Sequence, residues 1–145
     1  MSNRNCFISG IFRLALAAAA IVSLMLASAS VARSEDRIFE MRKYTAHEGK
    51  LADLHKRFRD HTNYLFVKHG MSLIGYWTPV EGPEAANTLI YILAYPSREA
   101  REASWKAFMN DPEWKKAFEE SHKNGVLVAK VEATFMTPTD YSPTH

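Results

Sequence analysis

The sequence predicts an α+β domain of the ferredoxin-like βαββαβ type, and two observations support this. Segments with the two-residue alternation of strands and segments with the 3.6-residue spacing of helices follow one another in that order from residue 37 to residue 136. The turn-forming run Glu81-Gly82-Pro83-Glu84 joins the two middle strands as a hairpin. Such a chain places its helices on one face of a four-stranded antiparallel sheet, with the first and last strands as neighbours.

The first strand is predicted over residues 37–44, with Phe39 and Met41 on one face and Glu40, Arg42 and Tyr44 on the other. A helix is predicted over residues 48–68, since apolar or small residues recur there at steps of three and four and His69-Gly70 follows as a stop signal. Residues 71–78 and 88–95 are rich in strand formers and apolar on both faces.

Ser97 is the predicted N-cap of a second helix that extends through Met109. Its expected buried side is made of small residues: Ala100, Ala103, Ser104 and Ala107. Trp105 lies on the other side of that helix, where we expect it to contact a loop or a partner. Asp111 caps a third, short helix with Pro112 in its first position, and a last strand over residues 126–136 completes the fold.

Residues 1–32 have the order of charges and apolar residues that is typical of a secretory signal peptide. Two arginines precede a nearly unbroken apolar stretch over residues 14–27, and small residues around Ala32 fit signal-peptidase cleavage there. A membrane span needs about 20 apolar residues. We therefore expect a periplasmic or secreted domain over residues 33–145, without a stable membrane anchor after cleavage. An uncleaved membrane-associated helix is the alternative.

The composition of residues 33–145 narrows the classes of partner. Two of the 18 basic residues lie within the leader and none of the 16 acidic ones do, so the rest of the chain is formally near neutral. Nucleic-acid binding is not expected, because it requires a basic surface. The single cysteine, Cys6, is in the leader, so the domain must be held by its core and not by disulfides. The hairpin strands are apolar on both faces, which predicts a second subunit packed on the sheet as a homodimer.

Several short motifs resemble the NIPSNAP family. The run Ile38-Phe39-Glu40-Met41-Arg42-Lys43-Tyr44-Thr45, followed by Glu48-Gly49-Lys50-Leu51, is similar to the opening of that domain. Gly75-Tyr76-Trp77, Asp111-Pro112-Glu113-Trp114 and Pro138-Thr139-Asp140-Tyr141-Ser142-Pro143 match in order and spacing. Glu48 stands where the family usually has proline and Met41 where it usually has leucine. The resemblance implies a dimeric α+β barrel but no particular reaction, because the family has no established catalytic residues.

The strongest candidate site is the polar face of the first and last strands. Expected ligand-binding residues are Glu40, Arg42, Tyr44, Trp77, Lys130 and Glu132. If the apolar faces cover the helices, these polar groups point between the sheets of two subunits, where Arg42 or Lys130 fixes an anionic group and Glu40 or Glu132 handles a proton. The alternative interpretation is a ladder of ion pairs that sets register and dimer geometry.

The histidines predict no metal site. His55 and His61 fall on opposite borders of the apolar stripe of the first helix, and no His-x-x-x-His pair is present. His69 or His61 could still serve as a haem ligand or general base if it faced the barrel. No cofactor is otherwise expected, and motifs for a hydrolase nucleophile or a phosphate loop are absent from the sequence.

Three hypotheses for function follow. The first is a small-molecule-binding protein that holds a partly apolar ligand in its barrel. The second is a cofactor-free or haem-dependent oxygenase, as the resemblance to that superfamily allows. The third is a structural or interaction module with a filled barrel.

Overall fold

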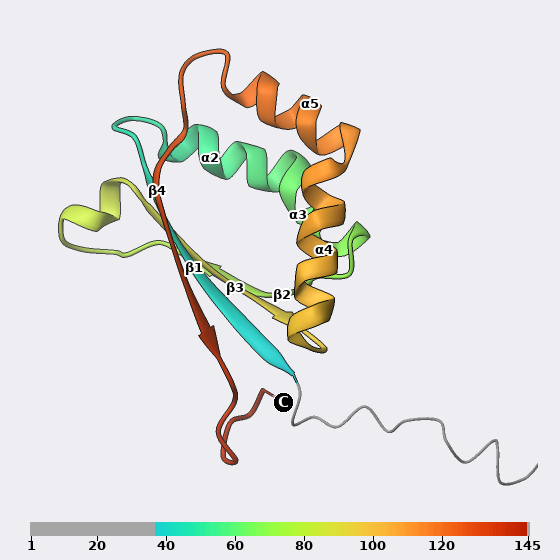
Figure 1. Cartoon of the computed structure of the whole chain (residues 1–145). Helices are drawn as coiled ribbons and strands as arrows, with labels where there is room; N and C mark the ends of the chain where they lie inside the picture. The colour runs from blue at the N-terminus through green and yellow to red at the C-terminus, as the bar shows by residue number, and fades with distance from the viewer. Residues whose placement is uncertain (1–36, 145) are drawn as a thin grey trace, which may run out of the picture. The chain divides into compact units, whose positions relative to one another are not determined.

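The computed structural model describes residues 37–144 (Figure 1). The expected signal peptide, residues 1–32, and its cleavage after Ala32 lie outside the described residues. Four strands form one antiparallel sheet in the order β2-β3-β1-β4. They are β1 (Ile38–Ala46), β2 (Ser72–Trp77), β3 (Thr88–Tyr95) and β4 (Val128–Met136). The predicted hairpin and the pairing of the first strand with the last are both confirmed.

The helices lie on one face of this sheet (Figure 1). They are α2 (Leu51–Arg57), the π-helical turn η3 (Phe58–Thr62), α3 (Asn63–Lys68), α4 (Arg98–Asn110) and α5 (Pro112–Ser121), and a short 3₁₀ turn, η4 (Pro83–Ala86), lies in the hairpin loop. Ser97 caps α4 by accepting from the Ala100 N–H, and Asp111 caps α5 by accepting from the Glu113 N–H. The predicted α+β fold class is therefore confirmed.

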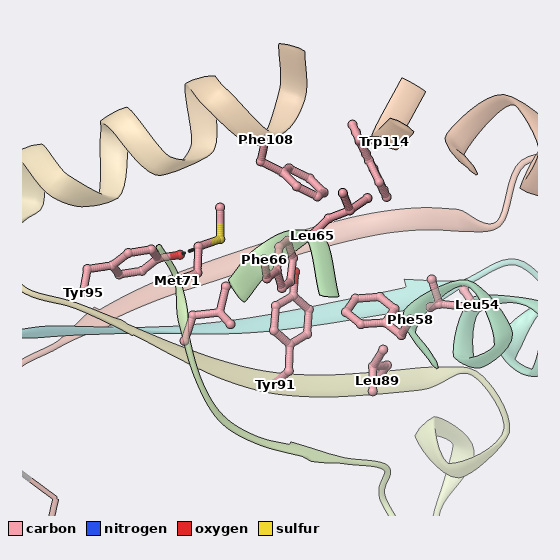
Figure 2. Close-up of a cluster of buried hydrophobic side chains, with 12 residues drawn as sticks. Leu54, Phe58, Leu65, Phe66, Met71, Leu89, Tyr91, Tyr95, Phe108 and Trp114 are labelled. Atoms are coloured by element: carbon pink, nitrogen blue, oxygen red, sulfur yellow. Dashed lines mark hydrogen bonds between the residues drawn. The ribbon is translucent and has the colours of Figure 1, made fainter. Parts of the chain in front are cut away.

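The core fills the space between the helices and the helix-facing side of the sheet (Figure 2). Leu54 and Leu65 of the helices and Leu93 of β3 are fully buried there. Aromatic rings fill the centre, where Phe58 meets Tyr91 edge to face with centroids 5.2 Å apart. Burial of each such side chain contributes about 1.5–3 kcal/mol. The helical segment that begins with α2 ends at Lys68, and Gly70 follows at a φ of +79°, which is the left-handed conformation that commonly terminates a helix.

The prediction that the polar face of β1 points away from the helices is wrong. Glu40 is fully buried beneath α4, whereas Met41 lies on the opposite side of the sheet, which we call the open face. The reason is that α4 supplies charged and N–H partners for the Glu40 carboxylate, so its burial is compensated.

The buried side of α4 also differs from the expectation. Ala103 and Ala107 are exposed, and α4 packs through Trp105 and Phe108. Trp105 therefore packs against the core and not against a loop. Its large side chain spans the gap between α4 and the sheet, which small residues could not fill.

Candidate ligand-binding site

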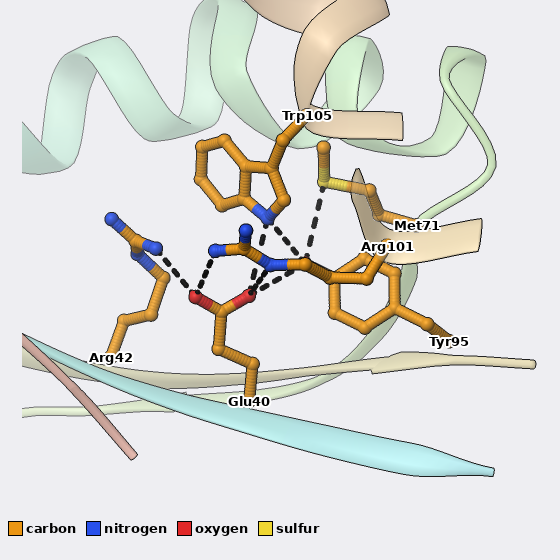
Figure 3. A network of polar contacts seen from close by, with 6 residues as sticks. All are labelled: Glu40, Arg42, Met71, Tyr95, Arg101 and Trp105. Carbon is orange, nitrogen blue, oxygen red and sulfur yellow. Dashed lines mark hydrogen bonds and ion pairs between the residues drawn. The ribbon is translucent and has the colours of Figure 1, made fainter. Parts of the chain in front are cut away.

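A buried carboxylate organises one end of the space beneath the helices. Glu40 accepts hydrogen bonds from two arginines: Arg42 of β1 at 2.6 Å, and Arg101 of α4 through Nε at 3.0 Å and Nη2 at 2.8 Å (Figure 3). Tyr95 Oη and Trp105 Nε1 each lie 3.2 Å from Glu40 Oε2. We call these five residues the Glu40 cluster.

The Glu40 cluster perturbs the ionisation of its own members. Burial alone would raise the pKa of Glu40, but the hydrogen bonds and charges of Arg101 and Arg42 outweigh it and hold that pKa below its ordinary value of 4.5. Burial, and then the adjacent Glu40 charge, raise the pKa of Tyr95 far above its ordinary value. Glu40 is therefore a permanently charged anchor near neutral pH and is poorly suited to exchange protons.

A cavity of about 240 Å³ adjoins this cluster between the helices and strands β1 and β4. We call it the aromatic cavity. Its lining comprises Arg42, Tyr44, Arg57, Phe58, Thr62, Phe66, Trp105, Phe108, Met109, Trp114, Phe118, Val128 and Val131. Val131 is 47% exposed and Phe118 43%, so the cavity is accessible where β4 and α5 border it. Such an apolar hollow with a few charged groups is typical of sites for small molecules.

Two guanidinium groups belong to the wall of the aromatic cavity. Arg42 lies over the Trp105 ring, with Cζ 4.4 Å from the ring centroid, and pairs with Glu40. Arg57 lies over the rings of Trp114 and Phe118, at 5.3 and 5.6 Å. Within residues 37–144 no carboxylate pairs with Arg57, and its only hydrogen bond is from Nη1 to Ser121 Oγ at 3.3 Å.

The π-helical turn positions three of the cavity residues. Asn63 donates its N–H to the Phe58 carbonyl, five residues back, and Thr62 Oγ1 donates to the Arg57 carbonyl at 3.2 Å. The extra residue in this turn lets Arg57, Phe58 and Thr62 all face the interior. Single π turns inside helices are frequent at functional sites.

The structure separates the six site residues predicted from sequence. Glu40, Arg42 and Tyr44 face the helices, and the last two line the aromatic cavity. The expectation that Lys130 and Glu132 join them is wrong, because the register pairs Arg42 with Ala133 and Lys43 with Glu132. These two charges are on the open face instead.

The charges on the open face form simple surface ion pairs. Lys130 Nζ and Glu132 Oε1 are 3.0 Å apart, with the two side chains 64% and 47% exposed. Trp77 also lies outside the aromatic cavity. It borders a separate hollow of about 270 Å³ at the edge strand β2, together with His55 and Arg59.

Sequence reasoning missed Arg57. It lies in a helix among charged neighbours, Lys56 and Arg59, and looks like another solvated residue. The available signal was its place one residue before Phe58, at the border of the apolar stripe. The π turn, which brings it inside, has no sequence signature that we recognise.

None of the cavity-lining residues is a histidine. His69 lies at the end of α3, where Nε2 is 2.7 Å from Asp111 Oδ2, and His61 borders a surface hollow between α2 and α5. A haem in the aromatic cavity would therefore have no histidine ligand from these described residues. Among residues 37–144 we find no group of three or more metal-ligating side chains.

No helix in the described part of the chain has the length and apolar character of a membrane span.

Solved structures with the same fold belong to bacterial NIPSNAP proteins. A family protein of unknown function from Agrobacterium tumefaciens str. C58 is 24% identical, with a TM-score of 0.67 over 77% of this chain and 96% of that one. Another from the same organism is 26% identical, with a TM-score of 0.66 over 75% and 99% of the two chains. An uncharacterized NIPSNAP-like domain protein from Burkholderia xenovorans is 20% identical, with a TM-score of 0.66 over 75% and 90%.

Two further comparisons use the sequence, and the one with family models agrees with this likeness. No curated protein matches the chain. The NIPSNAP family model matches residues 39–143, which is most of the chain and nearly all of the described part. The match includes β1 from Phe39 onward, every described helix and β4, and so all the residues that line the aromatic cavity. The chain belongs to the NIPSNAP family.

Proposed function

We propose that this protein binds a small, partly apolar molecule in the aromatic cavity. The observation that supports the proposal most directly is an accessible hollow of about 240 Å³ whose wall is mainly aromatic. A filled structural module would instead leave no accessible hollow beside these rings. The volume lies just below the 300–1,000 Å³ of pockets for drug-sized ligands, so the expected ligand has one or two rings.

Binding of a neutral probe tests this proposal. Calorimetric titration with 2-naphthol should give saturable binding to the wild-type protein. Val131→Trp places an indole in the cavity and should abolish that binding, whereas Val126→Trp, at a site 57% exposed and outside the lining, should not. Equal binding by the two variants would contradict the proposal, as would the absence of any binding to the wild type.

Native mass spectrometry of protein from its own host complements this titration. A co-purified small molecule, lost in Val131→Trp and kept in Val126→Trp, is the result that we expect.

We further propose that the protein acts as an exported homodimer. For export, the support is the composition of residues 1–32, and N-terminal sequencing of the protein from cells should begin near Arg33. For the dimer, the support is the open face, where Trp77 is 50% exposed beside the half-buried Ile90 and Ile92. Tyr91, between these two isoleucines in β3, is fully buried on the helix side and is not part of the open face.

Light scattering tests the dimer. At micromolar concentration the mass should be about twice that of the mature chain, and Trp77→Asp should weaken association. A folded wild-type monomer at all concentrations would refute the homodimer and leave cavity binding untouched.

A further inference from the structure

The aromatic cavity contains an arginine whose charge is not balanced. Arg57 is 5% exposed, and its Nε is a buried donor without an acceptor. Its single hydrogen bond, to Ser121, uses Nη1. The Nε and Nη2 groups form the side edge of the guanidinium, and the described residues provide no acceptor along that edge.

The nearest acidic side chains do not supply the missing charge. Asp53, Asp60 and the exposed Glu120 share an outer hollow with Arg57 between α2 and α5. Asp53 lies 3.7 Å from Lys50 Nζ, and Asp60 is paired with Lys56 one turn away. The two aspartates have lysine partners at the surface, and none of the three carboxylates forms an ion pair with Arg57.

The rings around Arg57 compensate only part of the cost of its burial. A buried charge is normally paired, because desolvation costs several kcal/mol. Contacts with Trp114 and Phe118 offset part of this cost but supply no counter-charge. Burial also lowers the pKa of Arg57, although Tyr44 and Tyr91 counteract it in part. Arginine nevertheless stays protonated in proteins, so the cationic charge remains in the wall.

The cavity wall as a whole has an excess of positive charge. Arg42 and Arg101 share the single carboxylate of Glu40, and Arg57 has none. An anion inside the cavity would therefore meet a net positive wall in a setting where charges are weakly screened. Seven of the thirteen lining side chains are aromatic, which suits a flat ring attached to that anion.

We propose that the ligand of the aromatic cavity is a small aromatic carboxylate, whose carboxylate pairs with the Arg57 guanidinium and whose ring lies against the accessible part of the wall at Phe118 and Val131. This inference rests on the proposed function and adds the chemical class of the ligand. Thr62 does not compete for the carboxylate, because its hydroxyl donates to the Arg57 carbonyl.

Calorimetry with acid and amide pairs tests the inference. The probes are benzoate, phenylacetate and indole-3-acetate, each compared with its primary amide, which has a similar shape and no charge. For wild-type protein at pH 7, at least one acid should bind about tenfold or more tightly than its amide, as expected for a charge-assisted pair. Arg57→Met should remove this preference while amide binding persists.

The matched control is Arg59→Met, two residues later in the same helix and exposed. It should keep the preference of the wild type. A thermal melt of each variant checks that the fold is intact, and Arg57→Met should melt no lower than Arg59→Met.

Two outcomes would overturn the inference. If acids and amides bind equally to wild type, or if Arg57→Met retains the preference, the carboxylate assignment is wrong and the cavity remains a site for neutral ligands. If no probe of either kind binds, and 2-naphthol also fails, the proposed function is overturned together with this inference.

Discussion

The two ends of the space beneath the helices hold the same kind of side chain in different states. In the Glu40 cluster, two guanidinium groups share one carboxylate through three hydrogen bonds, and Trp105 and Tyr95 also donate to that carboxylate. Across the cavity, Arg57 has rings and one serine hydroxyl. A charge whose partners are all within the chain stabilises the fold. A buried charge that lacks one is a candidate for binding a ligand.

The two regions also join different elements of the fold. The Glu40 cluster joins β1, the end of β3 and α4, and so fixes how α4 lies on the sheet. Arg57 joins α2 to α5 only through contacts with rings and Ser121. Mutations in the first region should therefore affect stability, and mutations in the second should affect binding.

The largest expected effect on stability comes from Glu40→Gln. The change leaves Arg42 and Arg101 without their shared carboxylate, and the loss of one partner of a buried ion pair costs about 3–5 kcal/mol. Chemical denaturation should report this loss in the free energy of unfolding. Glu132→Gln, in an exposed pair with Lys130, is the matched control and should cost about 0.5 kcal/mol or less. Equal losses in the two variants would contradict the role given to the Glu40 cluster.

A smaller loss is expected for Arg42→Met, which keeps the apolar stem over Trp105 and removes the charge. Glu40 retains its two hydrogen bonds with Arg101, so the cost should be about 1–3 kcal/mol. Lys43→Met alters the next residue, which pairs with Glu84 nearer the surface, and should change stability by about 0.5 kcal/mol or less. If Arg42→Met left the free energy of unfolding unchanged, Arg42 would belong to the ligand site and not to the fold.

The pH dependence of stability offers a separate test of the same cluster. Because the pKa of Glu40 is lowered in the folded protein, its contribution is complete above the ordinary value of 4.5 and is lost as the pH falls through the folded value. The stability difference between wild type and Glu40→Gln should thus be constant from pH 7 to pH 5 and narrow below pH 4.5. Denaturation curves at several pH values would measure it. A difference that stays constant to pH 3 would show that the charge of Glu40 does not matter.

The smallest effect, and of opposite sign, is expected for Arg57→Met. Because the charge is buried without a carboxylate, its replacement by an apolar side chain should leave stability unchanged or raise it by about 1 kcal/mol. Equilibrium unfolding in the absence of added ligand gives this value. A clear destabilisation would mean that the contacts with Trp114, Phe118 and Ser121 are structural, and the contrast between the two regions would disappear.

Most of the fold could be predicted because it depends on local patterns. The alternation in residues 128–136, the caps at Ser97 and Asp111 and the turn at Gly82-Pro83 act within a few residues. Local patterns could not predict which side of the sheet the polar face of β1 lies on. It depends on Arg101 and Trp105, 61 and 65 residues away in the chain, and on the energetic balance between burying a charge and pairing it.

The candidate site was predicted only in part for the same reason. Arg42 and Tyr44 were identified because they share a strand face with Glu40. Lys130 and Glu132 were included by assuming a register in which both polar faces coincide, and a shift of one residue reverses the face of every side chain. Arg57 was not identified as a site residue because helical periodicity alone places it at a border between buried and exposed positions.

The π-helical turn has a consequence for how this pocket can change over generations. A turn with one additional residue puts the helix before Phe58 and the helix after Thr62 out of phase by about 100°. Loss of a single codon within residues 58–62 could restore a regular helix and rotate Arg57 relative to α3, with the sheet untouched. One short deletion, instead of many substitutions, thus separates a pocket with a cation in its wall from one without it, and this gives the fold a direct route between ligands of different charge.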